Sequence, residues 1–365
     1  MSLKKIALII PGGLGTGKNN IGVPVLEQIV QLLSHQFDIT VFQLYKVNHG
    51  YKPNGFRLFG FTSENKLGQY FRFAFAFYRE NKKNNFEAIH GFWVWPCGFL
   101  AVALGGIFKI KSVVSVLGGD ASSLPEIKYG HLRKRVSRKM ILWSLEKSDE
   151  ATALTSYLAK NLYQVGLRRK LKIIPWGVDQ HLFTFRDRIL QNPIQFLHIA
   201  NLNPLKDQRT LLYAFKIINQ SVPSRLTIIG EGTEEKNIIS LIDRLSLQDV
   251  VTIHSQLPYE QLPYFYHRSD FLLHTSRSEG QSEVVTEAIS SGVLVAGTEV
   301  GLIHDCPEFC ISVKVGDYES LAKKVLSLLK DVDRMKDLRE KAHTWTADHA
   351  IQWTVSMISQ LYLSK

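Results

Sequence analysis

The feature that most constrains the fold is an alternation of short apolar runs with longer segments of helical periodicity, which restarts near residue 193. Continuous runs of Ile, Val and Leu are typical of strands buried on both faces of a parallel sheet, with helices connecting them. About a dozen such units exceed one ordinary open sheet, and their uneven spacing does not fit an eight-unit barrel. We therefore predict an α/β protein with two doubly wound parallel-sheet domains.

The expected elements divide into two series. In the first half, strands are expected at 5–10, 38–43, 86–90, 112–116, 149–153 and 171–174, and helices at 23–35, 64–82, 131–147 and 156–166. In the second half, strands are expected at 193–199, 225–230, 250–254, 270–275 and 293–297, and helices at 207–220, 232–246, 259–268 and 282–291. Two further helical segments, 317–331 and 334–363, follow with no strand between them.

The boundary between the two series is the polar segment 184–193, which ends in Asn-Pro. We predict an N-terminal domain over 1–185, a C-terminal domain over 186–345, and a C-terminal helix over 346–365 that packs back on the N-terminal domain. Ligands of doubly wound sheets bind beyond the carboxyl ends of the strands, next to helix N-termini. Turns that follow strands are therefore the places to search for a site.

Charge and composition limit the partners and the compartment. The net charge of +11 favours an anionic partner, such as a phosphate, an acidic membrane surface or nucleic acid. The three cysteines form no disulfide framework and indicate a reducing compartment, and Cys306 and Cys310 lack the further ligands of a zinc site. The first apolar run is too short for a signal peptide, and the longest, 98–108, is too short to span a bilayer. We expect a cytoplasmic protein with at most peripheral membrane contact.

A glycine-rich loop follows the first strand. Residues Gly12–Asn19 read G-x-x-x-x-G-K-N and lack only the final Ser or Thr of a P-loop. Asn19 does not supply the hydroxyl that binds Mg²⁺, and the helix is not expected before Val23 or Pro24, whereas a P-loop lysine opens its helix. A P-loop-like NTPase using this loop stays open as an alternative.

The most informative stretch is DFLLHTSRSEGQSEVVTEAISSGVLVAGTEVG, residues 270–301. Glu279 lies in the turn after a buried strand, and Glu283 and Glu287 share one face of the following helix. Three residues before that helix offer backbone N–H groups to an anion: Gly280, Gln281 and Ser282. Taken alone, the pattern fits equally well a Ser-capped surface helix with acidic residues near its positive end.

The segment EGQSEVVTEA, followed by Gly292, resembles the E-x7-E signature of retaining glycosyltransferases of family 4, which have the GT-B fold. Further segments resemble this family in its order: IIPWGVDQHLF (173–183), HIANLNPLKDQRTLLYAF (198–215), RLTIIGEG (225–232) and GTEVG (297–301). In the first half, FEAIHGFWVWPCGFLA and VVSVLGGD take the places of two further family loops. The resemblance implies two Rossmann-like domains facing each other across a cleft.

The resemblance also implies roles for residues of the second domain. The donor is a nucleotide-diphosphate sugar, used as co-substrate without a cofactor or metal. Glu287 then binds the ribose hydroxyls. Glu279 is assigned as a catalytic residue that holds hydroxyls of the transferred sugar, which the turn 280–282, continued by Glu283, also binds. Lys206 neutralises the diphosphate leaving group, where charge develops as the glycosidic bond breaks.

Four residues of the first domain join the predicted site. The Gly12–Gly13 pair lets the backbone approach the donor diphosphate. His90, at a strand end, is assigned to catalysis through contact with acceptor or sugar, and Asp120 to a substrate hydroxyl. A structural histidine and an Asx turn are the respective alternatives.

Two positions depart from the family pattern. Asn201 stands where the family usually has an Arg, and we include Asn201 in the predicted substrate site at that position. Leu117 stands where the family often has a His. Residues that could supply the missing cation are Arg133, Lys134 and Arg209. The departures leave a catalytically inactive nucleotide-sugar-binding protein as a second alternative.

A basic cluster and an aromatic cluster of the first half are candidates for contact with the acceptor or with a membrane. An anionic membrane surface, or a lipid-linked phosphate, is expected to meet Arg133, Lys134, Arg135, Arg138 and Lys139, a solvated helix face being the alternative. In the run 70–85, the helical spacing of Phe71, Ala74, Phe75 and Tyr78 predicts a core helix with these residues inward. No RNA-binding signature is present, so nucleic acid is not an expected partner.

The sequence thus predicts a retaining, metal-independent transferase of the hexosyltransferase type, acting on a glycan or lipid-linked acceptor in cell-surface polysaccharide or glycoconjugate synthesis. In the family mechanism the acceptor attacks from the face that the leaving phosphate vacates, and that phosphate accepts the acceptor's proton. The Asp-Val-Asp at 331–333 is interpreted as a helix start and not as a metal motif.

Overall fold

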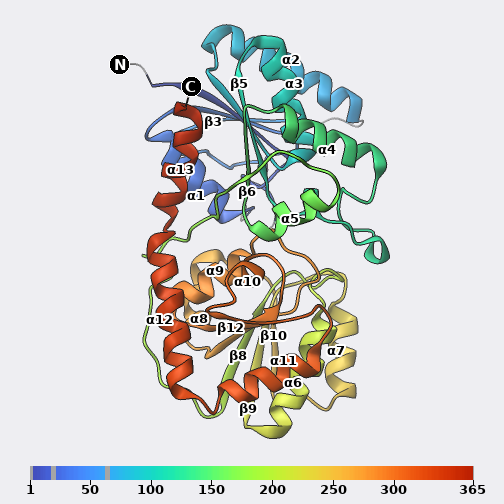
Figure 1. The fold of residues 1–365 in the computed structure, drawn as a ribbon, viewed down its shortest axis with the longest axis vertical. Helices are drawn as coiled ribbons and strands as arrows, with labels where there is room; N and C mark the ends of the chain where they lie inside the picture. Colours follow the sequence, from blue (N-terminus) through green and yellow to red (C-terminus); the bar gives the residue numbers. More distant parts are fainter. Residues whose placement is uncertain (1–2, 18–21, 62–65, 365) are drawn as a thin grey trace. The chain divides into compact units, whose positions relative to one another are not determined.

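The structure is a computed structural model that describes residues 3–17, 22–61 and 66–364. The chain forms two compact units, each built on its own parallel sheet (Figure 1). Unit 1 comprises residues 1–176 and 351–365, and unit 2 comprises residues 177–350. Both units are doubly wound and Rossmann-like, as predicted.

Unit 1 has a seven-stranded sheet in the order β3-β2-β1-β4-β5-β6-β7, in which every pairing is parallel. Its strands are β1 (Lys5–Ile10), β2 (Asp38–Gln43), β3 (Arg57–Gly60), β4 (Ala88–Phe92), β5 (Lys111–Val116), β6 (Glu150–Ala153) and β7 (Lys172–Ile173). Its helices are α1 (Pro24–Ser34), α2 (Lys66–Asn84), α3 (Phe99–Phe108), α4 (Arg135–Lys147), α5 (Ser156–Gln164) and α13 (Ile351–Leu363).

Helices cover both faces of the sheet in unit 1, because alternate residues of a buried strand point to opposite faces. Ile6, Leu8 and Ile10 of β1 share a core with α1 and the C-terminal helix α13. The intervening Ala7 and Ile9 share a second core with α2 and α3. Figure 1 shows α13 lying along α1, where Ser359 Oγ donates to the side chain of Gln36.

Unit 2 has a six-stranded parallel sheet in the order β10-β9-β8-β11-β12-β13. Its strands are β8 (Ile194–Ile199), β9 (Ser224–Ile229), β10 (Val251–His254), β11 (Phe271–His274), β12 (Leu294–Thr298) and β13 (Cys310–Val313). Its helices are α6 (Gln208–Ser221), α7 (Glu235–Arg244), α8 (Leu262–Tyr266), α9 (Glu283–Ser290), α10 (Leu302–Asp305), α11 (Tyr318–Leu328) and α12 (Val332–Asp348).

The division between the units lies at 176/177, nine residues before the expected 185/186 boundary. Side-chain contacts explain why 177–185 goes with unit 2. Phe183 is fully buried in the core of unit 2, and its carbonyl accepts a hydrogen bond of 2.7 Å from Ser290 Oγ. The chain returns to unit 1 at 350/351 instead of 345/346, because the segment expected as one helix over 334–363 breaks between α12 and α13.

The helix expected over 64–82 is present as α2, but the prediction of which face is buried was wrong. Phe71, Phe75 and Tyr78 are 70%, 68% and 49% exposed, and Ala74 is exposed as well. Phe73 and Phe77 are the aromatic residues that α2 buries, against Phe42 of β2. Four elements were not expected: β3, α3, α10 and β13. Within the described residues, no helix is long and apolar enough to cross a bilayer.

Candidate active site

The predicted site residues of unit 2 lie on the turns that follow β8 and β11, which are neighbours in the sheet. Lys206 ends the loop after β8, just before Asp207, whose side chain caps α6 by accepting from the Thr210 backbone N–H. Thr275, directly after β11, donates its hydroxyl to the carbonyls of Lys206 and Asp207, at 3.1 Å each. The turn after β11 thereby fixes the backbone that carries Lys206.

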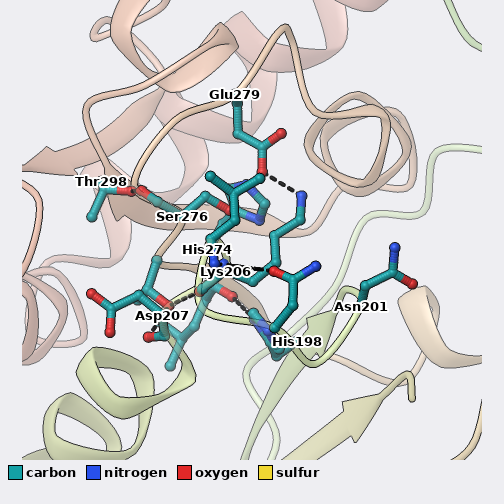
Figure 2. A network of polar contacts seen from close by, with 12 residues as sticks. His198, Asn201, Lys206, Asp207, His274, Ser276, Glu279 and Thr298 are labelled. Carbon is teal, nitrogen blue, oxygen red and sulfur yellow. Dashed lines mark hydrogen bonds and ion pairs between the residues drawn. The ribbon is translucent and has the colours of Figure 1, made fainter. Parts of the chain in front are cut away.

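Lys206 and Glu279 meet directly in the site. Lys206 Nζ lies 2.5 Å from Glu279 Oε1, and His274 Nε2 lies 3.1 Å from the same oxygen. Figure 2 shows the Lys206 and Glu279 side chains pointing toward each other, with a dashed line joining them. The side chains of Lys206, Glu279 and His274 are only 19%, 10% and 1% exposed. A cation and a carboxylate are thus paired at the carboxyl end of the sheet.

Electrostatics keep the Glu279 carboxylate ionised. Burial by itself would raise the pKa of Glu279, but the positive charge of Lys206 and the hydrogen bond with His274 outweigh it. The pKa of Glu279 is therefore well below its ordinary value. An ionised carboxylate can accept hydrogen bonds from sugar hydroxyls on any lone pair that its protein partners leave.

Glu283 and Glu287 lie one helical turn apart on α9 and behave differently from Glu279. Burial and the neighbouring charge of Glu287 raise the pKa of Glu283 to about 8. Burial also raises the pKa of Glu287 to about 7, although hydrogen bonds from Tyr266 and Tyr259 oppose the shift. The Tyr266 hydroxyl donates to Glu287 Oε2 at 2.7 Å. The site therefore combines one firmly ionised carboxylate, Glu279, with a mostly protonated one, Glu283, and with Glu287, whose pKa is close to neutral pH.

The turn Gly280–Gln281–Ser282 is fixed at its middle residue. Gln281 Nε2 donates to Thr286 Oγ1 at 3.0 Å, and the Gln281 carbonyl accepts from the Leu302 backbone N–H at 3.0 Å. Gly301 (φ +56°) permits this close approach, because a Cβ there would lie 2.8 Å from both the Gln281 carbonyl oxygen and Glu279 Cβ. The final glycine of GTEVG thus packs directly behind the turn that holds Glu279.

Asn201 lies on the loop after β8, the same loop that carries Lys206 (Figure 2). The carbonyl of Asn201 accepts from Gln208 Nε2 at 3.1 Å, and the side chain of Asn201 is exposed. His198 connects this loop to β11. Its Nδ1 donates to the Leu273 carbonyl at 2.8 Å, and its Nε2 lies 3.3 Å from Gln208 Nε2. Because burial lowers the pKa of His198 to about 3, the ring is neutral and Nε2 acts as the acceptor.

In unit 1, His90 has a structural role in place of the predicted catalytic one. It is fully buried within β4, and both ring nitrogens have partners at 2.8 Å: Nδ1 pairs with the Tyr362 hydroxyl and Nε2 with Ser115 Oγ. Burial lowers the pKa of His90 to about 3, so the ring is neutral. A neutral imidazole with both nitrogens engaged inside the core has no free atom for a substrate.

Asp120 also departs from its predicted contact with a substrate hydroxyl. Its Oδ2 accepts from the Val94 backbone N–H at 2.7 Å, and its Oδ1 accepts from the Gly118 backbone N–H at 2.9 Å. The side chain is 1% exposed, and burial raises its pKa in spite of these backbone hydrogen bonds. Asp120 therefore holds its own turn through Gly118 and joins it to the segment at Val94, which agrees with the alternative of a structural Asx turn.

Gly12 and Gly13 form the turn after β1. Gly13 has φ +115°, and its carbonyl accepts from the Val23 backbone N–H at 2.9 Å, one residue before α1 begins at Pro24. The helix start at Pro24 agrees with the prediction. Lys18 and Asn19 of the P-loop-like motif lie outside the described residues. The role of the two glycines toward a phosphate stays a prediction.

The remaining predicted positions are placed as follows. Leu117 is 7% exposed in the core of unit 1. Arg133, Lys134, Arg135 and Lys139 are exposed at the start of α4, and Arg138 is partly buried. Among the described residues, no cluster of three or more His, Cys, Asp or Glu side chains could hold a metal ion.

Sequence reasoning missed His274 and Tyr266. His274 ends a buried strand five residues before Glu279, so the rule that ligands bind beyond strand ends could have pointed to it. Tyr266 had no such signal, because it ends α8 and reaches Glu287 only through the tertiary fold.

Comparison with known proteins agrees with this geometry. Residues 23–182 match the model of Glycosyltransferase Family 4, and residues 180–345 match that of Glycosyl transferases group 1. N-acetyl-alpha-D-glucosaminyl L-malate synthase of Bacillus anthracis is 25% identical over 72% of this chain and 70% of its own length.

Two solved structures share the fold over 99% of this chain. Sucrose-phosphate synthase of Thermosynechococcus elongatus has a TM-score of 0.80 at 18% identity over 98% of its own chain. Alr3699/HepE of Anabaena, solved in complex with UDP, has a TM-score of 0.78 at 17% identity over its whole chain. Together with the two family models, these likenesses show that the chain belongs to the family 4 glycosyltransferases of the GT-B fold.

Proposed function

We propose that this glycosyltransferase moves a hexosyl group from a nucleotide-diphosphate sugar to a glycan or lipid-linked acceptor, with retention of anomeric configuration and without a metal. The observation that carries the proposal is the Lys206–Glu279 pair, which lies on the turns after two neighbouring strands. Glu287 follows in the second turn of α9, at the spacing that the family uses for ribose. That HepE was solved with UDP supports a nucleotide donor.

Donor binding on this account exchanges the partners of Lys206 and Glu279. The diphosphate replaces Glu279 as the partner of the Lys206 ammonium, and the carboxylate of Glu279 turns to hydroxyls of the sugar. His274 stays hydrogen-bonded to Glu279 during the exchange, because it approaches the carboxylate from the strand end and not from the Lys206 loop. The ion pair of the free protein thus keeps both groups desolvated and in place.

Lys206 then supports bond cleavage. Negative charge develops on the leaving diphosphate as the glycosidic bond breaks, and a preorganised ammonium lowers that barrier. The leaving phosphate accepts the proton of the acceptor hydroxyl, which attacks from the same face, so no glutamate needs to act as a hydrolase-type acid or base. The basic residues at the start of α4 would meet an anionic acceptor, such as a lipid-linked phosphate, on the cytoplasmic side, in polysaccharide or glycoconjugate synthesis.

The test is a transfer assay with a panel of nucleotide sugars and glycan or lipid-linked acceptors. We expect transfer that persists in EDTA, a product with the donor's anomeric configuration by NMR, and loss of transfer in Glu279→Gln. Glu260→Gln, which removes an exposed carboxylate of unit 2, is the matched control and should leave transfer unchanged.

Two outcomes would replace this proposal. ATP turnover that Glu279→Gln leaves intact would favour an NTPase using the Gly12–Asn19 loop. Tight donor binding without turnover on any acceptor would favour an inactive nucleotide-sugar-binding protein, as the Asn201 and Leu117 departures from the family pattern allow.

A further inference from the structure

Helix α2 of unit 1 exposes a continuous apolar stripe. Leu67, Phe71, Phe75 and Tyr78 follow one another at helical spacing and are 70%, 70%, 68% and 49% exposed. Isolated exposed apolar residues are ordinary, but contiguous ones mark an interaction surface. At its far end the stripe continues onto α3, where Phe108 lies 6.3 Å from the Tyr78 ring and Ile107 is 71% exposed.

The stripe is not a packing fault of a helix with too many aromatic residues. The opposite face of α2 packs well: Phe73 and Phe77 are 1% and 0% exposed, and their rings lie 6.0 Å and 5.4 Å from that of Phe42. The core of unit 1 is therefore complete without the outer residues. Phe71, Phe75 and Tyr78 need a reason to be apolar that lies outside the unit.

Basic side chains border the stripe on the exposed side of α2. Arg72, Arg79 and Lys83 are exposed along one edge, and Lys82 lies 6.0 Å over the Tyr78 ring. The single acidic residue of α2, Glu80, is buried and pairs with Arg79. The outward surface of α2 is thus half apolar with aromatic rings and half cationic, with no acidic side chain.

We propose that this surface of α2, with Ile107 and Phe108 of α3, docks on an anionic lipid bilayer. Helices that lie in the membrane interface place aromatic and aliphatic residues among the acyl chains and basic residues at the headgroups, which is the division seen on α2. A second copy of the chain fits less well, because a two-fold contact would place this face, which has four basic side chains and no acidic one, against itself.

The proposal places the membrane contact on a different element from the basic cluster that the sequence indicated. That cluster lies at the start of α4, so mutation can separate the two surfaces. The inference also uses no feature of the donor site in unit 2. Vesicle binding and donor binding can therefore fail independently of each other.

The first experiment measures sedimentation of the full chain with phosphatidylglycerol–phosphatidylcholine vesicles and with pure phosphatidylcholine. The double variant Phe71→Ser/Phe75→Ser should lower the partition coefficient on acidic vesicles by roughly tenfold or more, since two aromatic side chains leave the acyl region. Ile189→Ser is the matched control, because Ile189 is an apolar residue of unit 2 with 92% exposure, and it should change nothing. Donor binding and the thermal midpoint should be unchanged in all three proteins.

A second experiment places the contact on α2 directly. The native cysteines Cys97, Cys306 and Cys310 are buried, so a fluorophore on Ala74→Cys labels the stripe alone. Its emission should shift to the blue on acidic vesicles, and the same label on Ile189→Cys should not shift.

Three results would overturn the proposal. The first is a Phe71→Ser/Phe75→Ser variant that partitions onto acidic vesicles as strongly as the unmodified protein, or an unmodified protein that shows no preference for acidic vesicles. The second is loss of binding only in Arg133→Ser/Lys134→Ser, which would make α4 the contact. The third is a change from dimer to monomer in Phe71→Ser/Phe75→Ser, which would assign the stripe to a second copy of the chain.

Discussion

Two buried histidines lie on corresponding strands of the two units and have different surroundings. His90 lies in β4 and His274 ends β11, and each of these strands neighbours the first strand of its sheet. Both side chains are withdrawn from solvent. His90 binds a tyrosine and a serine within the core, whereas His274 binds the carboxylate of Glu279.

The difference teaches that a histidine inside a strand, such as His90, is satisfied by core partners, whereas one at the end of a strand, such as His274, can reach a residue of the following turn. Both nitrogens of His90 have partners, so the residue joins α13 to the sheet of unit 1 through Tyr362. Within the described residues, Nδ1 of His274 has no hydrogen-bond partner, and Nε2 is directed at Glu279. His274 is therefore part of the site, and His90 is part of the scaffold.

The largest expected effect is that of Lys206, the cation of the His274 site. The hydrogen-bonding partners of His90 within the described residues include no such cation. Lys206→Met should lower kcat of transfer by about 10²–10³, because it removes a preorganised charge from the leaving diphosphate. Steady-state kinetics measure the effect, and Lys236→Met, which removes an exposed lysine of unit 2, is the control. Equal kcat values for the two variants would contradict the role of Lys206.

His274→Leu should lower kcat by roughly tenfold to a hundredfold, since a hydrogen bond to a charged group is worth about 1.5–3 kcal/mol. His274→Gln should recover most of the loss, because its amide can donate near the position of Nε2. The affinity for a nucleotide diphosphate without the sugar should stay unchanged, which separates positioning of Glu279 from general damage. A parallel loss of that affinity would reduce His274 to a structural residue like His90.

His90→Leu should behave in the opposite way. It leaves the Tyr362 hydroxyl buried without its partner and should lower the free energy of unfolding by about 1–3 kcal/mol, measured by urea denaturation. Tyr362→Phe, which removes the other half of the same hydrogen bond, should cost less because the histidine keeps Ser115. The kcat of the folded His90→Leu enzyme should match that of the unmodified protein, and a selective loss of kcat would restore the catalytic prediction.

The smallest expected effect is a pH dependence from Glu283. Burial and Glu287 raise the pKa of Glu283 from 4.5 to about 8. The folded protein therefore binds more protons than the unfolded chain in this interval, and the contribution of Glu283 to stability falls as the pH rises through it. Relative to the unmodified protein, Glu283→Gln should gain more than about 1 kcal/mol in unfolding free energy between pH 5 and pH 8. Glu260→Gln should show no such trend, and a flat difference for Glu283→Gln would contradict the pKa shift.

Much of the fold was predictable because buried parallel strands consist of continuous runs of apolar residues, which are recognisable in the sequence. The elements that were missed lack that signal. The strand β3 has only four residues, none of them fully buried, and α3 carries Gly105 and Gly106, which weaken a helical pattern. The face of α2 could not be chosen from periodicity, because aromatic residues occur on nearly every side of the helix. Which of them pack inward is decided by residues of other elements, such as Phe42 and Phe86.

The site was predictable where turns follow strands and where the family resemblance assigned a residue, as with Lys206 and Glu279. Their contact was not, because it depends on β8 and β11 being neighbours in the sheet. His90 and Asp120 were assigned by the same logic, and their roles were decided by partners far away in the sequence, Tyr362 and Val94. A one-dimensional pattern contains no information about such partners.

The central claim is that donor binding divides the Lys206–Glu279 pair between diphosphate and sugar, and calorimetric titration tests it most directly. The nucleotide of the best donor is titrated as the diphosphate and as the diphosphate sugar into the unmodified protein, Lys206→Met and Glu279→Gln. We predict that Lys206→Met weakens both ligands, whereas Glu279→Gln weakens the sugar nucleotide and leaves the diphosphate as tight or tighter, because Lys206 is then released from its carboxylate partner. Equal weakening of both ligands by Glu279→Gln would contradict the account.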